Sequence, residues 1–228
     1  MNVPLFRNIG SGAFIFLTML LYTVFGVFLY AQQTSSAVLP LVETLTKTLN
    51  SSASEEQRLE AAERLAPLLE QIGSYAQADT VYRTAASLAG KKSLRAQRHL
   101  LGAVRCSLAC ADVSSADFLL STAFSSASEP DIKADAKLYA LWSWIIKAQS
   151  EEELEGPIDV LKTYAVSAEM ESVKPAILLT LHHITGEKRW AKQLQDEFPD
   201  SPEAAVSAGN ARLLPAPFWF FLKTYTAE

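Results

Sequence analysis

The sequence predicts an all-α protein, in which an N-terminal transmembrane helix precedes a series of helical hairpins. Three observations carry this prediction. Alanine and leucine are abundant, only nine of the 228 residues are glycine, and no sustained alternation of Val, Ile or Thr bounded by turns indicates strands. Apolar residues instead recur at steps of three and four, as on the buried face of a helix. An uncharged, apolar run from Ile9 to Ala31 comes before these segments.

The run from Ile9 to Ala31 is long enough to cross the hydrocarbon core of a membrane, which needs about 20 residues. Arg7 precedes the run, whereas the first basic residue after it is Lys47, which Glu43 balances. Because basic residues stay on the cytoplasmic side, we expect a cytoplasmic N-terminus and an exported remainder. The prediction is a single-pass protein of the bacterial inner membrane with a periplasmic C-terminal domain.

A cleaved signal peptide is the alternative interpretation of residues 1–33. Ser35-Ser36-Ala37 offers small residues at both positions of a cleavage site. The apolar cores of signal peptides usually span about 7–15 residues, however, and this run is longer. No cysteine stands directly after the run, so the sequence does not support a lipoprotein modification at this end. Both interpretations export the domain.

One helix–turn–helix unit is predicted between Ser54 and Ala89. A capping box of Ser54 with Gln57 starts its first helix, and Gly73 can take the left-handed conformation that ends it. The residues expected on the buried faces are Ala62, Leu65, Ala66 and Leu69 in the first helix, and Tyr75, Ala78, Tyr82 and Ala85 in the second.

A second capping box, of Ser74 with Gln77, is expected to start the second helix of this unit. Ala78 is small where two helices must approach closely, and Asp79, one position further round the helix, is expected in solvent. The combination of glycine, cap and small or large side chains resembles a tetratricopeptide repeat (TPR). The resemblance implies stacked helical hairpins whose inner faces hold a peptide or another protein.

Weaker copies of the unit follow. Ala116 and Ala191 take the place of Ala78, at intervals near the roughly 34 residues of a TPR unit. In the first of these copies, the turn is expected at Asp112 and Val113, and the buried face at Leu120 and Ala123. Between the copies, Pro157 stands where the small residue should be, so that the third repeat is degenerate.

After the last copy, Ser201 as N-cap and Pro202 at the first helical position start a further helix. The resemblance covers about residues 54 to 210. The chain is long enough, and at 49% hydrophobic content apolar enough, to bury one substantial helical core. We therefore predict a TPR-like α-solenoid over residues 34–214 and an aromatic C-terminal tail over residues 215–228.

Two groups of aromatic residues admit more than one role. Those of the tail lie at Phe218 to Phe221, where they cap the open end of the solenoid or contact a membrane or a partner. The second group recurs at helical spacing and belongs to the repeat core or to a ligand groove; it consists of Tyr139, Trp142 and Ile146, broadened by Trp144 and Ile145.

The sequence contains none of the usual catalytic motifs: no Gly-rich phosphate loop, nucleophile elbow or His-Glu-x-x-His pair. Cys106 and Cys110 share one face of a helix over residues 94–111, but without a nearby His or carboxylate they make a poor zinc site. We expect both thiols to be small buried groups. His99 stands alone, and His182 and His183 point in different directions. We therefore assign no catalytic, cofactor-binding or metal-binding residue and no cofactor.

The resemblance implies a noncatalytic scaffold, similar to small membrane-anchored periplasmic TPR proteins that assist protein translocation or the assembly of envelope and flagellar machines. Its partner is a protein or peptide on the solenoid surface, and a net charge of −5 argues against nucleic acid. Arg58, Arg98 and Lys137 are groove candidates on the first helices, although solvation explains each equally well. The alternative is an exported helical enzyme that uses His99 or His182 with an acidic neighbour.

Overall fold

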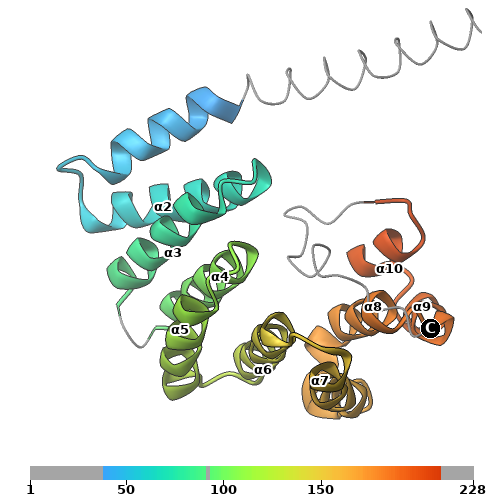
Figure 1. The fold of residues 1–228 in the computed structure, drawn as a ribbon. Coiled ribbons are helices and arrows are strands. Elements are labelled where there is room, and N and C mark those ends of the chain that lie inside the picture. The colour runs from blue at the N-terminus through green and yellow to red at the C-terminus, as the bar shows by residue number, and fades with distance from the viewer. Residues whose placement is uncertain (1–37, 91–92, 212–228) are drawn as a thin grey trace, which may run out of the picture. The chain divides into compact units, whose positions relative to one another are not determined.

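Every regular element within residues 38–90 and 93–211, which the computed structural model describes, is a helix (Figure 1). The all-α prediction is confirmed for this part of the chain. A first helix covers residues 38–49. The others are α2 (Glu55–Gln71), α3 (Tyr75–Leu88), α4 (Leu94–Ala109), α5 (Val113–Ser126), α6 (Pro130–Lys147), α7 (Glu151–Tyr164), the 3-10 helix η1 (Ala168–Val173), α8 (Lys174–Thr185), α9 (Lys188–Glu197) and α10 (Pro202–Ser207).

The predicted anchor at Ile9 to Ala31 and the aromatic tail of residues 215–228 lie outside the described residues. Among the helices that are described, none combines the length and the apolar character that a membrane span requires. The contacts divide the chain after Thr44, and the helices from Leu45 onward belong to one unit.

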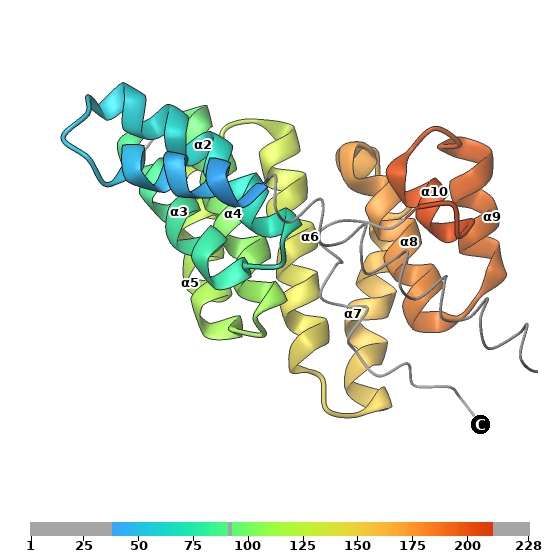
Figure 2. The ribbon, with the colours of Figure 1, turned by 90° about the horizontal axis from the view of Figure 1, so that it is seen from above.

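Consecutive helices of this unit pack on one another as repeat-like hairpins. Helix α2 pairs with α3 and α4 with α5, while α3 packs on α4 and so joins the two hairpins (Figure 2). Helix α6 then contacts α4, α5 and α7, and the last helices gather around α8. Each helix therefore buries one face against its neighbours along the chain.

The first hairpin follows its predicted pattern closely. The amide of Gln57 donates to Ser54 Oγ at 3.3 Å, and the amide of Ser54 donates to Gln57 Oε1 at 3.1 Å, which completes the capping box. Gly73 has a φ of +77° at the end of α2. The expected core residues Ala62, Leu65, Ala66, Leu69, Ala78, Tyr82 and Ala85 are all buried, and Tyr75 is half-buried.

The second capping box is absent, because the end of α2 determines the conformation of Ser74. The amide of Ser74 donates to the carbonyl of Leu69 at 2.8 Å, and that of Gly73 donates to Glu70 at 2.9 Å. These two bonds form a Schellman motif. They hold Ser74 at a ψ of 56°, far from the extended ψ of 156° that lets Ser54 cap α2. The Ser74 side chain consequently makes no capping bond.

The second hairpin also matches its prediction, with a shift of one residue at the turn. Asp112 caps α5, since its Oδ1 accepts from the amide of Ser115 at 3.0 Å. Val113 is the first residue of α5 and not part of the turn. Ala116 and Ala123 are fully buried, and Leu120 is buried with them.

Further along the chain the repeat pattern weakens. Pro157 lies inside α7, where it is buried. In α9 the expected small contact residue, Ala191, is only half-buried, whereas Trp190 and Leu194 are buried. The buried face of α9 is therefore centred on Trp190 and Leu194 and not on Ala191, the position that the repeat pattern predicted. Ser201 does cap α10, through a 3.1 Å bond from the amide of Ala204.

The aromatic stripe of α6 divides between core and surface. Tyr139 and Trp142 are buried and stack with their ring centroids 5.2 Å apart. Trp142 Nε1 also donates to Thr180 Oγ1 at 3.2 Å, which ties α6 to α8. Ile145 is buried and Ile146 half-buried, but Trp144 keeps 45% of its surface exposed.

Candidate functional site

Three glutamates of α2, spaced by seven residues, lie on the side of that helix that faces α4. Seven residues make two turns, so Glu56, Glu63 and Glu70 share one face. Helix α4 presents basic or titratable side chains to the same line, namely Arg95, His99 and Arg105. We call these six residues the α2–α4 ladder.

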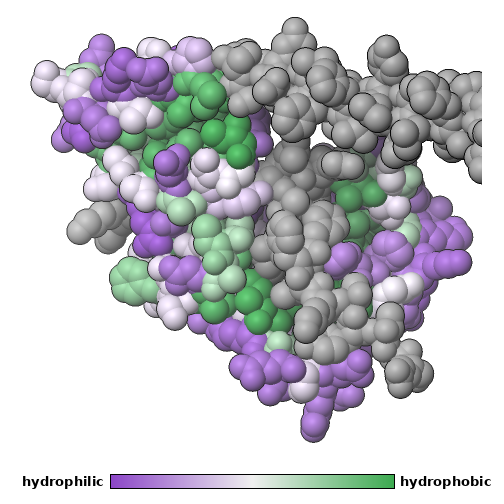
Figure 3. Space-filling model, turned by 45° about the horizontal axis from the view of Figure 1, so that its top comes forward, coloured by the Kyte–Doolittle hydropathy of each residue, from purple (hydrophilic) through white to green (hydrophobic). Residues whose placement is uncertain are grey.

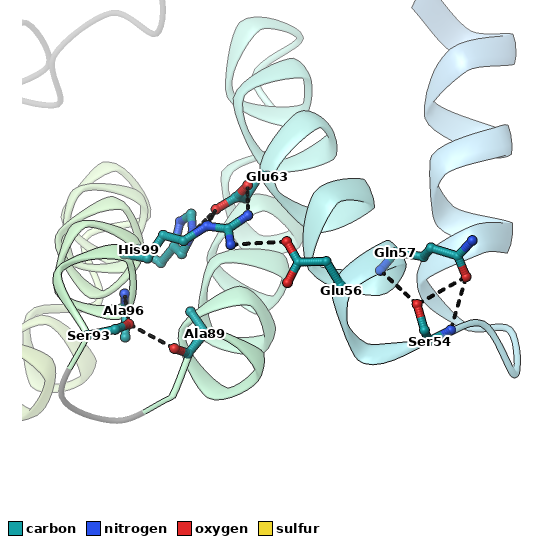
Figure 4. A network of polar contacts seen from close by, with 9 residues as sticks. Ser54, Glu56, Gln57, Glu63, Ala89, Ser93, Ala96 and His99 are labelled. Carbon is teal, nitrogen blue, oxygen red and sulfur yellow. Dashed lines mark hydrogen bonds and ion pairs between the residues drawn. The ribbon is translucent and has the colours of Figure 1, made fainter.

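The exposed end of the ladder is centred on Glu63 (Figure 4). Arg95 donates from Nε and Nη2 to the two carboxylate oxygens, each at 2.8 Å, and from Nη1 to Glu56 at 3.1 Å. His99 Nε2 lies 2.9 Å from Glu63 Oε1. The expectation that His99 stands alone is therefore wrong. The hydrogen bonds from Arg95 hold the pKa of Glu63 below its usual value, against the opposing effect of burial.

The inner end of the ladder is a carboxylate, Glu70, of which only 5% is exposed. Arg105 donates to its two oxygens at 2.9 and 2.8 Å, from Nε and Nη2. The hydroxyl of Tyr82 donates at 3.1 Å and the thiol of Cys106 at 3.2 Å. Four donated hydrogen bonds and one full opposite charge compensate the burial of this carboxylate.

The two cysteines have separate environments. Cys106 is fully buried, and its burial raises the pKa of the thiol well above the usual value. The thiol therefore stays protonated, as a hydrogen-bond donor and not a nucleophile. Cys110 is exposed, because α4 ends at Ala109 and Cys110 is its C-cap. The expectation of two buried thiols is correct for Cys106 and wrong for Cys110.

A glycine of α4 allows the aromatic ring of Tyr82 to lie between the two ends of the ladder. A Cβ at Gly102 would come within 2.8 Å of that ring. The ring centroid lies 6.2 Å from that of His99 and 6.0 Å from the Arg105 guanidinium carbon. Gly102 thus lets α3 and α4 approach closely enough for the hydroxyl of Tyr82 to reach Glu70.

Helix α6 continues the polar line beyond Arg105. Arg105 Nη1 donates to the hydroxyl of Tyr139 at 3.4 Å. Burial raises the pKa of Asp135 from 3.8 to about 6; the charge of Arg105 opposes this rise, and the charge of Asp131 adds to it. The carboxyl of Asp135 is consequently a titrating group near neutral pH.

Asp79 belongs to a second cross-helix contact and is not in solvent as expected. Its side chain is only 18% exposed. It accepts from Arg83 Nε at 2.7 Å and from Ser107 Oγ at 3.0 Å, so that it links α3 to α4.

Two of the three groove candidates bond to other residues of the protein. Arg58 Nε donates to the carbonyl of Leu49 at 3.0 Å, and Lys137 Nζ donates to Glu169 at 2.8 Å. Arg98 is exposed on α4. The partners of Arg58 and Lys137 lie in other helices, so the residue pattern of a single helix did not indicate them.

His99 and His182, the two candidates for a catalytic role, each have a polar partner within the protein. His99 does lie beside a carboxylate, but both oxygens of that carboxylate also accept from Arg95. His182 Nδ1 donates to the backbone carbonyl of Glu187 at 3.2 Å. Across the part of the chain that the structure describes, no group of three His, Cys, Asp or Glu side chains is placed to hold a metal ion.

One protein-family model matches the chain, over residues 146–228; the family is described as a middle domain, and its function is unknown. The matched part begins at the end of α6 and leaves the α2–α4 ladder outside. It covers less than half of the chain. Neither the curated proteins nor the solved structures yield a match.

Proposed function

We propose that this chain is a noncatalytic, TPR-like scaffold that binds a protein or peptide partner in the bacterial envelope. Its role is protein translocation or the assembly of envelope or flagellar machines. An uncleaved helix over Ile9 to Ala31 anchors it in the inner membrane, with the helical domain in the periplasm. The uncharged length of that run and its flanking charges support the anchor.

The observation that carries the proposal is the repetition of one packing unit. Helices α2–α3 and α4–α5 form successive hairpins, and α3 packs on α4 between them. Ala78 and Ala116 stand at corresponding places in the two second helices, and both are 0% exposed. Repeats that stack in this way present their first helices side by side, as a surface on which a partner can lie.

The α2–α4 ladder supports this role by making that surface rigid. Both arginine forks and all three carboxylates bond within the protein, so partner binding does not require these side chains to be ordered anew. A preorganised surface loses less conformational entropy when it binds. In addition, the face in Figure 3 shows hydrophobic residues gathered in patches, and large exposed patches of this kind often mark protein-binding surfaces.

Site-specific photo-crosslinking in native membranes tests the scaffold. A photoreactive amino acid at Arg98, exposed on α4, should capture one discrete protein that mass spectrometry then identifies. The matched control is the same amino acid at Val166, which is 82% exposed after α7. Equal adducts from both positions, or none from Arg98, would contradict the assignment of the partner surface to the first helices.

The contact between His99 and Glu63 favours the second candidate, an exported helical enzyme. The two candidates differ in what His99→Gln does in cells. If the protein is an enzyme, His99→Gln abolishes its function in cells, although the variant keeps the wild-type melting temperature and still captures the partner. If the protein is a scaffold, the variant loses function in cells only to the extent that its thermal stability falls.

A further inference from the structure

A pocket of about 350 Å³ lies where α6 ends and α7 begins, apart from the α2–α4 ladder. Its lining residues are Trp144, Lys147, Ala148, Glu152, Glu153 and Gly156. Neither the ladder nor the repeat packing gives these residues a role.

The indole ring of Trp144 is held against α7. A Cβ at Gly156 would lie 3.0 Å from Cζ2 and 3.1 Å from Cη2 of that ring, so the absence of a side chain at Gly156 makes room for the ring edge. The residue nevertheless keeps 45% of its surface exposed. A large aromatic ring that is fixed at one edge and open elsewhere is typical of a binding platform.

The charges of the pocket are predominantly negative. Lys147 donates from Nζ to Asp117 of α5 at 2.6 Å, and this ion pair offsets its charge. Glu153 Oε2 accepts from the amide of Gln149 at 2.7 Å, which fixes that carboxylate at the start of α7. Glu152 is exposed beside it. Two carboxylates therefore adjoin an exposed indole.

We propose that this pocket binds an arginine side chain of the partner protein, with its guanidinium against Trp144 and paired with Glu152 and Glu153. A guanidinium both stacks on aromatic rings and matches carboxylate geometry. An anionic group would be repelled, and a purely apolar group would desolvate two carboxylates without compensation. This subsite deepens the proposed scaffold function and depends on it.

A peptide titration of the full-length chain in detergent micelles tests the subsite. The probe is an acetylated Gly-Arg-Gly-Arg-Gly amide, and the comparison peptides carry Glu or Gln in place of Arg. The backbone amide resonance of Gly156 and the indole N–H of Trp144 should shift saturably with the arginine peptide alone, and 0.5 M salt should weaken the effect.

Three variants separate the contributions, with the Gly156 resonance as the common reporter. Trp144→Leu should weaken binding roughly three- to tenfold, as expected for the loss of a cation–π contact. Glu152→Gln should weaken it roughly two- to fivefold, and it keeps the proposal testable if Trp144→Leu folds poorly. Phe118→Leu, at a residue of α5 that is 69% exposed, should bind like the wild type.

Two outcomes would overturn the subsite: equal binding of the three peptides, or wild-type affinity of both pocket variants. The scaffold itself is judged separately, by photo-crosslinking from Arg98. A captured partner together with a silent pocket overturns only the subsite, whereas peptide binding without capture from Arg98 overturns the scaffold surface.

Discussion

Ala111 terminates α4 with a φ of 56°, a left-handed conformation that is unusual for a residue with a Cβ. Gly73 has the same place after α2, with a φ of 77°. Both amides close the same motif: that of Ala111 donates to Leu108, and that of Gly73 donates to Glu70. The first helices of the two hairpins therefore end in the same left-handed conformation with different residues, and the backbone of Ala111 is strained in that conformation.

A reciprocal pair of substitutions follows from this difference. Ala111→Gly should raise the free energy of unfolding by about 1 kcal/mol, because the backbone strain is relieved. Gly73→Ala should lower it by about 1 kcal/mol, although no atom beyond the two neighbouring residues lies within 4 Å of the added Cβ, because the strain is introduced there. Urea denaturation measures both changes, and shifts of the same sign would contradict this account of the helix ends.

Adjacent positions of α3 provide a second test at this scale. Ala78→Leu should cost roughly 1–3 kcal/mol of stability, because it forces methylenes into a fully buried helix contact. Asp79→Ala should cost about 1 kcal/mol, through loss of the bonds from Arg83 and Ser107. The control, Thr80→Ala, is exposed and should stay within about 0.5 kcal/mol. If Asp79→Ala melts at the same temperature as the wild type, the link between α3 and α4 contributes nothing to stability.

Between elements, the α2–α4 ladder provides side-chain contacts between two first helices whose main packing partners are other helices. Its two ends differ in environment, since Glu70 is buried and Glu56 is exposed. The same type of ion pair should therefore contribute differently at each end. A buried charge whose partner is removed is left uncompensated, whereas water replaces a lost partner at the surface.

Matched glutamine substitutions test this contrast. Glu70→Gln should lower the free energy of unfolding by about 2–3 kcal/mol, somewhat less than the roughly 3–5 kcal/mol typical of fully buried pairs, because Arg105 is itself partly exposed. Glu56→Gln should change it by less than about 0.5 kcal/mol. Chemical denaturation of both variants is the measurement. Similar losses at the two ends would mean that burial does not control the strength of the ladder.

The interface of α4 with α6 should respond to pH through Asp135. Its pKa in the folded protein, about 6, lies above the unfolded value of 3.8, so the folded state binds the proton more tightly. The resulting stabilisation is fully present below pH 4 and is lost as the pH rises through about 6, by roughly 3 kcal/mol in total. Asp135→Asn should remove this loss and be more stable than the wild type at pH 7.

Melting temperatures of the two proteins at intervals from pH 4 to pH 7 measure this effect. Asp200→Asn, at an exposed position, is the control and should keep the wild-type profile. Glu63 changes stability in the opposite direction and at lower pH. Its pKa is depressed in the folded protein, so its contribution to stability is lost only as the pH falls below about 4.5. Parallel profiles of wild type and Asp135→Asn would exclude Asp135 as the titrating group.

For the whole molecule, the main prediction concerns the anchor. The mature protein should retain residues 1–31 and resist extraction with alkaline carbonate, because an uncharged run of this length partitions stably into a bilayer. Membrane fractionation and N-terminal sequencing measure this. A mature chain that begins at Gln32 or Val38 would replace the anchor with a signal peptide and leave an exported domain free of the membrane.

The sequence by itself determined the local features of the described helices. The capping box at Ser54, the left-handed end at Gly73 and the buried alanines Ala78 and Ala116 each depend on residues within a few positions of one another. Backbone geometry and helical periodicity control such features, so they are visible in a linear pattern. At Pro157 and Ala191 the repeat pattern of small and large side chains is weaker, and there the pattern did not predict which face of the helix is buried.

Only the tertiary structure decided which polar side chains meet. His99 lies 36 positions from Glu63, and Arg105 lies 35 positions from Glu70, so their pairing depends on how closely α4 approaches α2 and α3. That approach depends on Gly102, whose missing side chain makes room for the ring of Tyr82. The seven-residue spacing of the α2 glutamates was the one trace of the ladder in the sequence. Arg95 and His99 share a face of α4 through their four-residue spacing, but that spacing did not show that they meet the α2 glutamates, because the packing of the helices brings them to the same line.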